Sequence, residues 1–309
     1  MEQKTVQKIS WTGIIIMLAG SIFFSTKAVI VKYAFKHTAI DAISLLALRM
    51  LFSLPFYLVM AWLAAKNEPN KKLTTKQWLY IFLLGVFGYY LSSLFDFMGL
   101  KFISAGIERL ILFLYPTFVL LINTVVFKES ASKTQWVAVA FTYIGVVLAY
   151  FGELSVQANN AHFLLGSGLI FLCAITFAIY TVGSGRLIPV AGATRFTAYA
   201  MLFSTAGIFI HFIVAGNYTI LHSGSNYVGY GFLIAIIATV IPSWLVAMGT
   251  KKIGANNAAI ISTIGPVSTI IQAHLILGEP IYTLQIIGTL FIVTGVLLIG
   301  WKQVKRGHS

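Results

Sequence analysis

Residues 99–130 read GLKFISAGIERLILFLYPTFVLLINTVVFKES, and residues 249–280 read GTKKIGANNAAIISTIGPVSTIIQAHLILGEP. The two stretches align at a constant offset of 150 residues without a gap, and the alignment extends to residues 152 and 302. Each copy contains an apolar span with a proline near its middle, a short charged turn and a second apolar span. The identical pairs include Gly99 and Gly249, Lys101 and Lys251, Ala105 and Ala255, Pro116 and Pro266, Glu129 and Glu279, Gln135 and Gln285, and Gly145 and Gly295.

The composition places the whole chain in a membrane. Hydrophobic residues make up 59% of it and charged residues 9%, and an apolar run of about 20 residues is long enough to cross the hydrocarbon core. We expect an all-α integral membrane protein of two five-helix repeats, residues 11–151 and 163–302. The ten predicted transmembrane helices are residues 11–31, 42–64, 77–97, 103–126, 134–151, 163–183, 195–214, 228–248, 255–276 and 282–301.

The net charge of +13 reflects membrane topology and does not indicate a nucleic-acid partner. With the N-terminus inside, fifteen of the 21 lysines and arginines fall on inward segments, three (Lys32, Lys36 and Lys101) fall on outward loops, and three lie within spans. This distribution follows the positive-inside rule and predicts a multi-pass protein of the inner (cell) membrane with both termini in the cytoplasm. Because each repeat has five helices, an odd number, the second repeat is expected to be inverted relative to the first.

The two stretches quoted above resemble the EamA domain of the drug/metabolite transporter superfamily. The segment DAISLLALRM at residues 41–50, which ends in an arginine and is followed by Pro55, is also similar to that family. The resemblance covers nearly the full chain as two EamA units. It implies ten helices, a central cavity formed by helices one to four and six to nine, peripheral fifth and tenth helices, and alternating-access transport, often export, of amino acids, other metabolites or drugs.

Five ionisable residues lie within predicted spans, and all of them belong to the first repeat: Lys27, Arg49, Asp96, Glu108 and Arg109. Charged groups are costly inside a membrane, so each is a candidate for substrate binding or coupling. The topology places all five toward the outer side, and we expect a paired network that borders an outward-opening cavity. The alternative is that these groups neutralise one another between helices and contact no substrate.

Glu108 is the candidate for coupling transport to protons. Its position in the second repeat is occupied by Ala258, so the repeated fold by itself does not require a carboxyl there. A carboxyl within the membrane can exchange protons with one side and then the other. Arg109 faces about 100° away from Glu108 on a helix, and we expect it to pair with another group such as Asp96.

The second repeat offers uncharged candidates for the same site. His211 and His274 are expected near the outer side, where each is either a packing residue or a proton carrier. The aromatic residues Tyr115, Tyr180 and Trp244 are expected to line the cavity, where they would stack on a substrate or attract a cation. Interfacial aromatic belts are the alternative explanation for such residues.

The repeated proline indicates a bend in the fourth helix of each repeat. Proline within a helix removes a backbone hydrogen bond and leaves a carbonyl group free. We therefore expect kinks or hinges at Pro116 and at Gly265–Pro266, around the cavity. For Glu129 and Glu279 the expected role is to stabilise helix N-termini, where negative charge is favoured.

Motifs for other functions are missing from the sequence. It contains no phosphate-binding G-x4-G-K-[ST] loop, no H-E-x-x-H, no clustered Cys and His, and no G-x-S-x-G. We therefore expect no catalytic residues, metal or cofactor. The leading hypothesis is a secondary active transporter, most often an exporter in such families, with a small-molecule substrate, protons as the coupling ion, and lipid as its surroundings. The alternatives are a lipid-handling protein or enzyme that uses the Glu108, Asp96 and arginine cluster, and a non-transporting subunit.

Overall fold

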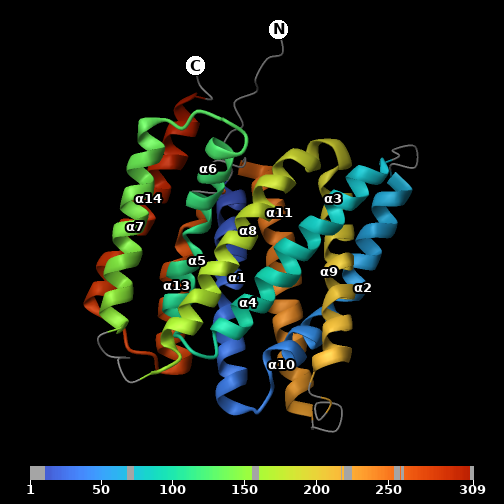
Figure 1. Cartoon of the computed structure of the whole chain (residues 1–309), viewed down its shortest axis with the longest axis horizontal. Helices are drawn as coiled ribbons and strands as arrows, with labels where there is room; N and C mark the ends of the chain where they lie inside the picture. The colour runs from blue at the N-terminus through green and yellow to red at the C-terminus, as the bar shows by residue number, and fades with distance from the viewer. Residues whose placement is uncertain are drawn as a thin grey trace.

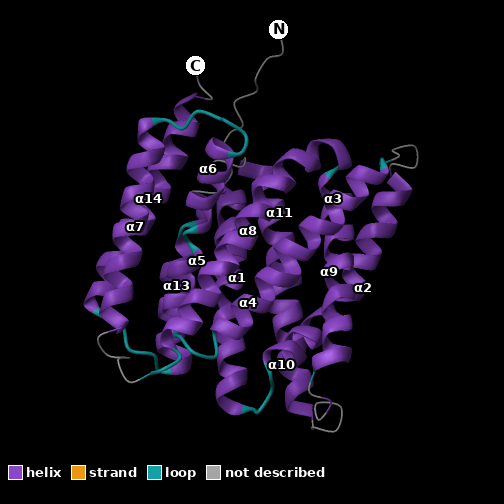
Figure 2. Cartoon of the chain, viewed as in Figure 1, coloured by secondary structure: helices purple, strands orange, loops and turns teal. Residues whose placement is uncertain are grey.

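The computed structural model describes residues 11–67, 73–154, 160–216, 218, 225–253, 258 and 261–306. Within these ranges the chain is helical and contains no strand, which confirms the predicted fold class (Figure 2). The first repeat comprises α1 (Trp11–His37), α2 (Ala42–Asn67), α3 (Thr75–Gly85), η1 (Val86–Leu91), α4 (Ser92–Gly99), α5 (Ala105–Leu112), α6 (Tyr115–Val125) and α7 (Lys133–Leu154).

The second repeat follows the same order. It comprises α8 (Phe163–Ala191), α9 (Ala193–Ala215), α10 (Ser225–Ala235), η3 (Ile236–Val240), α11 (Ile241–Ile253), α13 (Ile264–Gln272), η4 (Ala273–Leu277) and α14 (Thr283–Arg306). Among the described residues, eight helical spans are long and apolar enough to cross a membrane, and Ile264–Leu277 and Thr283–Gly295 are shorter apolar helices.

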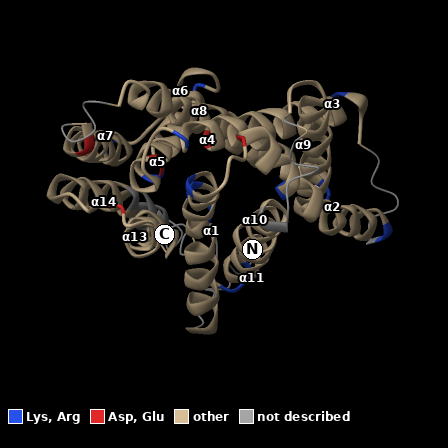
Figure 3. Ribbon diagram, turned by 90° about the horizontal axis from the view of Figure 1, so that it is seen from below, with Lys and Arg blue, Asp and Glu red and all other residues tan. Residues whose placement is uncertain are grey.

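Large apolar side chains cover the outside of the helix bundle. Leu164 is 70% exposed, Val214 79% and Trp62 60%, and such surfaces are stable in lipid because no water has to be ordered around them. Charged residues occupy few positions on the ribbon (Figure 3). The outer surface and the apolar helices together make this a multi-pass membrane protein.

The two repeats interlock and do not form separate bodies. The first helix of each repeat packs against the third helical span of the other, as α1 does on α11 and α8 on α4. The second helices, α2 and α9, pack on each other, and so do the fifth helices, α7 and α14, which stand together at one edge of the bundle (Figure 1). Gly145 of α7 and Gly288 of α14 permit this close approach, because a Cβ on either would meet the backbone carbonyl of the other.

The third and fourth spans of the two repeats depart from a regular α-helix at equivalent positions. The third span of each repeat contains a π-helical segment, η1 and η3, and the two segments begin 150 residues apart. The fourth span is broken before its proline: α5 ends at Leu112 and α6 begins at Tyr115, with Pro116 in its first turn, while α13 begins at Ile264 with Pro266 near its start. These interruptions lie where kinks were expected, and each proline stands in the first turn of a new helical segment.

One end of the bundle is sealed by contacts between the repeats. We call the end where α1 begins and α14 ends the terminal side, and the opposite end the far side (Figure 1). On the far side the Lys32 ammonium donates to the carbonyls of Leu100 (3.3 Å) and Ile103 (2.5 Å), and Lys36 donates to the carbonyl of Leu277 at 3.1 Å. These bonds tie the end of α1 to both repeats.

Glu279 adds a further bond between the repeats on the far side. Its carboxylate oxygens accept from the backbone N–H of Ala105 at 3.2 and 3.1 Å, so it caps the N-terminus of α5 in the other repeat. Burial raises the pKa of Glu279, and nearby Lys32 and the backbone N–H groups oppose that rise. Glu129 occupies the corresponding position in the first repeat, 150 residues earlier, and is therefore the repeat mate of Glu279. It is 58% exposed and instead pairs with Arg186 at 2.7 Å.

Candidate functional site

A cavity of about 1200 Å³ lies between the two repeats. Its lining runs from the middle of α1, α4, α5 and α8 to the first turn of α9, at Ala193 and Thr194 on the terminal side. Of the described residues, those at the far-side ends of the helices contribute nothing to this lining. The expected outward-opening cavity, on the side away from the termini, is therefore wrong for this structure, because the far side is closed by the bonds of Lys32, Lys36 and Glu279.

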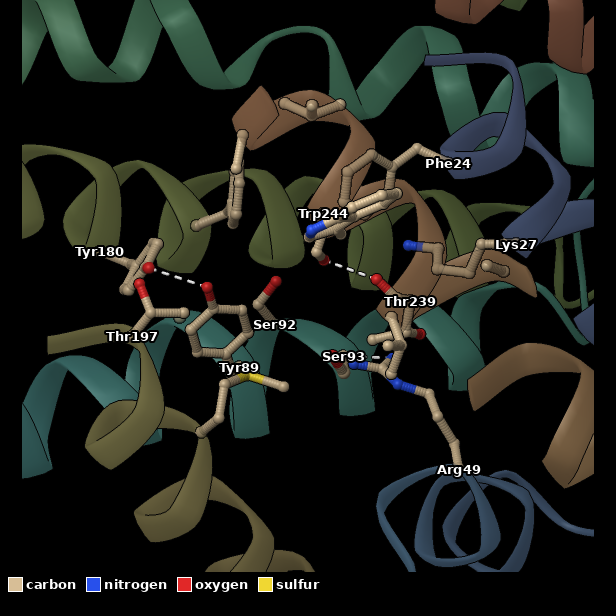
Figure 4. A pocket seen from close by; sticks show the side chains of 18 of the residues that line it. Phe24, Lys27, Arg49, Tyr89, Ser92, Ser93, Tyr180, Thr197, Thr239 and Trp244 are labelled. Carbon is tan, nitrogen blue, oxygen red and sulfur yellow. Dashed lines mark hydrogen bonds between the residues drawn. The ribbon is translucent and has the colours of Figure 1, made fainter. Parts of the chain in front are cut away.

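An ion pair lies at the inner, closed end of the cavity. The ammonium of Lys27 on α1 is 2.6 Å from Oδ2 of Asp96 on α4. The expected pairing of Asp96 with Arg109 is wrong, because the Asp96 carboxylate forms its ion pair with the ammonium of Lys27 on α1. Lys27 and Asp96 both line the cavity, and Figure 4 shows the Lys27 side chain entering it.

Glu108 lies directly behind this ion pair. It is fully buried and is not among the residues that line the cavity. Neither of its oxygens has a hydrogen-bond partner among the described residues, and the charged group that acts on it most strongly is the carboxyl of Asp96. Two carboxyls can bond each other only if one of them holds a proton. The Asp96–Glu108 pair is therefore a place where one proton can be held.

Arg49 reaches the same region from α2. Its side chain is 5% exposed, and one guanidinium nitrogen donates to Oγ of Ser93 at 3.3 Å, as Figure 4 shows. The guanidinium also lies 5.6 Å from the centre of the Phe97 ring, while Nε has no partner. The expected network of paired charges is thus only partly formed, because Arg49 has no carboxylate within ion-pair distance in the described chain.

Arg109 crosses from the first repeat to the break in the second. Its guanidinium lies 5.6 Å from the centre of the Phe113 ring, and a Cβ on Gly265 would be 2.8 Å from one of its terminal nitrogens. Gly265 therefore leaves the space that Arg109 occupies. The carbonyl of Gly265 accepts from the Ser25 hydroxyl at 3.1 Å, and this bond joins α1 to α13. Pro116 and Pro266 themselves do not line the cavity.

Aromatic side chains form the walls of the cavity. The hydroxyls of Tyr89 and Tyr180 are 2.8 Å apart, and Gly88 lets the Tyr180 ring pack against η1 (Figure 4). Tyr115 contacts Phe177 edge to face, with ring centres 5.1 Å apart. Trp244 lies beside Phe24 in the close-up view and is 63% exposed. All three aromatic candidates, Tyr115, Tyr180 and Trp244, line the cavity.

The two histidine candidates lie apart from this group. Nδ1 of His211 is 2.9 Å from the hydroxyl of Tyr90, and Nδ1 of His274 is 2.8 Å from the carbonyl of Glu279. Neither residue lines the cavity. The nearby carbonyl and hydroxyl give each ring a local hydrogen bond, so their contacts fit packing roles.

Several lining residues did not stand out in the sequence. Ser93, Ser92 and Tyr89 precede Asp96 by three, four and seven residues, which is the spacing of residues on one face of a helix. This spacing was the available sequence signal that they belong to the site. The π-helical segments were not foreseen, although both contribute to the lining, through Tyr89 of η1 and Thr239 of η3. Such segments frequently occur at functional sites.

The fold and the cavity define a class of protein: a helical membrane protein built from two inverted repeats around a central cavity. The model of the EamA-like transporter family matches residues 11–151 and 164–301. The chain belongs to this family, and it is a transporter of the drug/metabolite type. Across the described residues no cluster of three or more His, Cys, Asp or Glu is arranged to hold a metal ion.

Similar proteins cover nearly the whole chain. The uncharacterized transporter YcbK of Bacillus subtilis is 32% identical over all of this chain and 98% of its own length. The uncharacterized transporter YdfC of the same organism is 26% identical over 99% of this chain and 94% of its own. A crystal structure with 16% identity superposes with a TM-score of 0.63, covering 93% of this chain and 95% of the other, and it supports the fold alone.

Proposed function

We propose that this protein is a secondary active transporter that carries a small amphipathic or amino-acid-like metabolite out of the cell by alternating access. The observation that carries this proposal is the cavity between the repeats, which reaches the terminal side and is closed on the far side. A volume of about 1200 Å³ is ample for a small metabolite. An inverted repeat can form the opposite state by exchanging the roles of its two halves.

The proposed direction follows from the charge distribution. Lysine and arginine are concentrated on the segments at the terminal side, which is the pattern of a cytoplasmic face. With that orientation in the inner membrane, the cavity faces the cytoplasm, where an exporter takes up its substrate. Export then requires the far-side bonds of Lys32, Lys36 and Glu279 to open while the terminal side closes.

The Asp96–Glu108 pair is the proposed proton-coupling site. One proton shared between two buried carboxyls is a charge that can be exchanged when the cavity opens to one side and then to the other. Lys27 sits beside this pair at the closed end of the cavity, so a change in protonation alters the charge that the cavity presents to a substrate. Uptake of a proton from outside and its release inside would drive export.

The test is flux in proteoliposomes loaded with a mixed pool of metabolites, read by mass spectrometry with and without a proton gradient. The wild-type protein is expected to deplete one class of compound, faster with the gradient. Glu108→Gln is expected to lose the gradient-driven flux at least tenfold while keeping substrate exchange. Glu129→Gln, a carboxyl on the surface that pairs with Arg186, serves as the matched control and should keep both activities.

Unchanged gradient-driven flux in Glu108→Gln would remove this residue from the coupling step. A folded protein that moves no metabolite would contradict the transport proposal as a whole, and lipid movement in the same vesicles would then support the lipid-handling alternative.

A further inference from the structure

The inner end of the cavity carries a surplus of positive charge. Lys27, Arg49 and Arg109 line it, whereas Asp96 is the acidic residue among the described lining residues, with Glu108 behind it. Even if both carboxyls are ionised, three cations against two anions leave one positive charge without a counter-charge. A proton on the carboxyl pair raises the surplus to two. Uncompensated charge in a low-dielectric site is costly, so this site is suited to an anion.

The surplus resides on Arg49 and Arg109 because Lys27 is already paired with Asp96. Arg49 has five N–H donors in a rigid fork, yet among the described residues it has one hydrogen bond, to Ser93, and no partner for its buried Nε. Nε of Arg109 is also buried and finds no partner in the part of the chain that the structure describes. A planar guanidinium with free donors matches the two oxygens of a carboxylate.

Each of the two arginines acts on one member of the acidic pair. Arg49 interacts electrostatically with Asp96, and Arg109 interacts with Glu108. Each guanidinium also rests near a phenylalanine ring, which limits its range of positions. The aromatic wall reaches Arg109, since the Phe113 ring that lies 5.6 Å from its guanidinium also lines the cavity.

We propose that the substrate is an organic monocarboxylate with an aromatic or branched apolar body. Its carboxylate binds the guanidinium groups of Arg49 and Arg109, and its body lies among the rings of the cavity wall. This inference rests on the proposed function and narrows it. A zwitterionic amino acid is disfavoured, because its ammonium group would need Asp96, which Lys27 already occupies. The rings available to the apolar body are those of Phe24, Tyr115, Phe177, Tyr180 and Trp244.

The first test is binding to the full-length protein in nanodiscs, measured by isothermal titration against empty nanodiscs. The probes share one phenethyl body and differ in the polar group: 3-phenylpropionate, its methyl ester, its primary amide, L-phenylalanine and phenethylamine. The carboxylate is expected to bind at least tenfold more tightly than the ester and the amide, and more tightly than L-phenylalanine. Phenethylamine is expected to bind most weakly, since the site is already positive.

The second test uses variants that keep or remove the charge. Arg49→Gln and Arg109→Gln are each expected to weaken binding of 3-phenylpropionate by about 10- to 100-fold and to leave the ester unchanged. Arg49→Lys keeps the positive charge but lacks the planar, forked guanidinium group. Its affinity for 3-phenylpropionate is expected to lie between those of the wild type and Arg49→Gln. Arg186→Gln, an arginine on the surface that pairs with Glu129, is the matched control and should bind the carboxylate as wild type does.

Equal binding of acid and ester to the wild-type protein overturns the inference, and so does tightest binding of the amine or no binding of any probe. These outcomes need no variant to fold. Carboxylate-selective binding without flux in proteoliposomes would support the inference and contradict the proposed transport. Flux of metabolites with no preference for carboxylates would support the proposed transport and contradict the inference.

Discussion

The third and fourth helical spans of the two repeats match closely in backbone and differ in chemistry. Both third spans contain a π-helical segment that lines the cavity, and both fourth spans break before a proline. Asp96 and Glu108 of the first repeat, however, correspond at the offset of 150 to Val246 and Ala258 in the second. The repeated backbone forms the cavity, and among the described lining residues the charged ones all belong to the first repeat.

This difference suggests how one fold can serve many substrates. In the proposed alternating-access mechanism, backbone features needed for opening and closing must occur in both repeats, because each repeat would close one side in turn. The groups that bind a substrate need to occur only once. Residues with an identical repeat mate, such as Pro116 and Glu279, are therefore expected to affect the rate or direction of opening. Residues without one, such as Arg49, are expected to affect recognition.

The largest expected effect is at Asp96. Asp96→Asn leaves the ammonium of Lys27 without its counter-charge at a buried site and should lower the free energy of unfolding by about 3–5 kcal/mol. The repeat-mate variant Val246→Ala removes only apolar contacts and should cost roughly 1–2 kcal/mol. Denaturation in detergent micelles measures both. The double variant Lys27→Met with Asp96→Leu should recover most of the loss, and equal costs for Asp96→Asn and Val246→Ala would contradict the asymmetry.

A smaller effect is expected at the two helix breaks. Pro116→Ala and Pro266→Ala should each allow a continuous helix to compete with the break, and the double variant should fold but transport about tenfold more slowly. The measurement is the initial flux rate in proteoliposomes with protein amount held constant. Similar losses in the two single variants would fit equal roles for the repeats, whereas a wild-type rate in the double variant would rule out a role in gating.

The smallest expected effect concerns the two repeated glutamates. Glu279→Gln weakens the cap on α5 and should lower stability by about 0.5–2 kcal/mol, while Glu129→Gln, at an exposed ion pair, should cost about 1 kcal/mol or less. A cysteine at Ser93, in a Cys173→Ser background, reports access to the cavity. Its labelling by a membrane-impermeant thiol reagent from the far side should rise several-fold in Glu279→Gln and stay at the wild-type level in Glu129→Gln. Equal labelling in both variants would show that Glu279 does not help to seal that side.

Much of the architecture could be predicted because long apolar runs and a gapless repeat are local properties of the chain. The expected helix at residues 42–64 is observed at Ala42–Asn67, and the one at 134–151 at Lys133–Leu154. The candidates Lys27, Arg49, Asp96 and Arg109 all reach the cavity, because charge inside an apolar span has few other stable places. The expected helix at residues 255–276 lies partly outside the described residues.

The partners of these charges could not be predicted. Asp96 pairs with Lys27 and not with Arg109, and Arg109 extends over Gly265 of the other repeat. Both results depend on how α1 and α13 pack beside α4 and α5, which no spacing along the chain specifies. For the same reason His211 and His274, which share an expected depth with Glu108, lie outside the cavity lining.

The sequence by itself determined that this chain crosses the membrane many times, that its halves are repeated and inverted, and that the charged candidates for the site belong to the first half. Hydropathy, repeat offset and an odd number of spans are enough for these conclusions. Tertiary structure alone decided which side of the cavity is open, which residues seal the other side, and which arginines remain unpaired. An inverted repeat allows the same sequence to close either side, so only the packing of the helices distinguishes the two states.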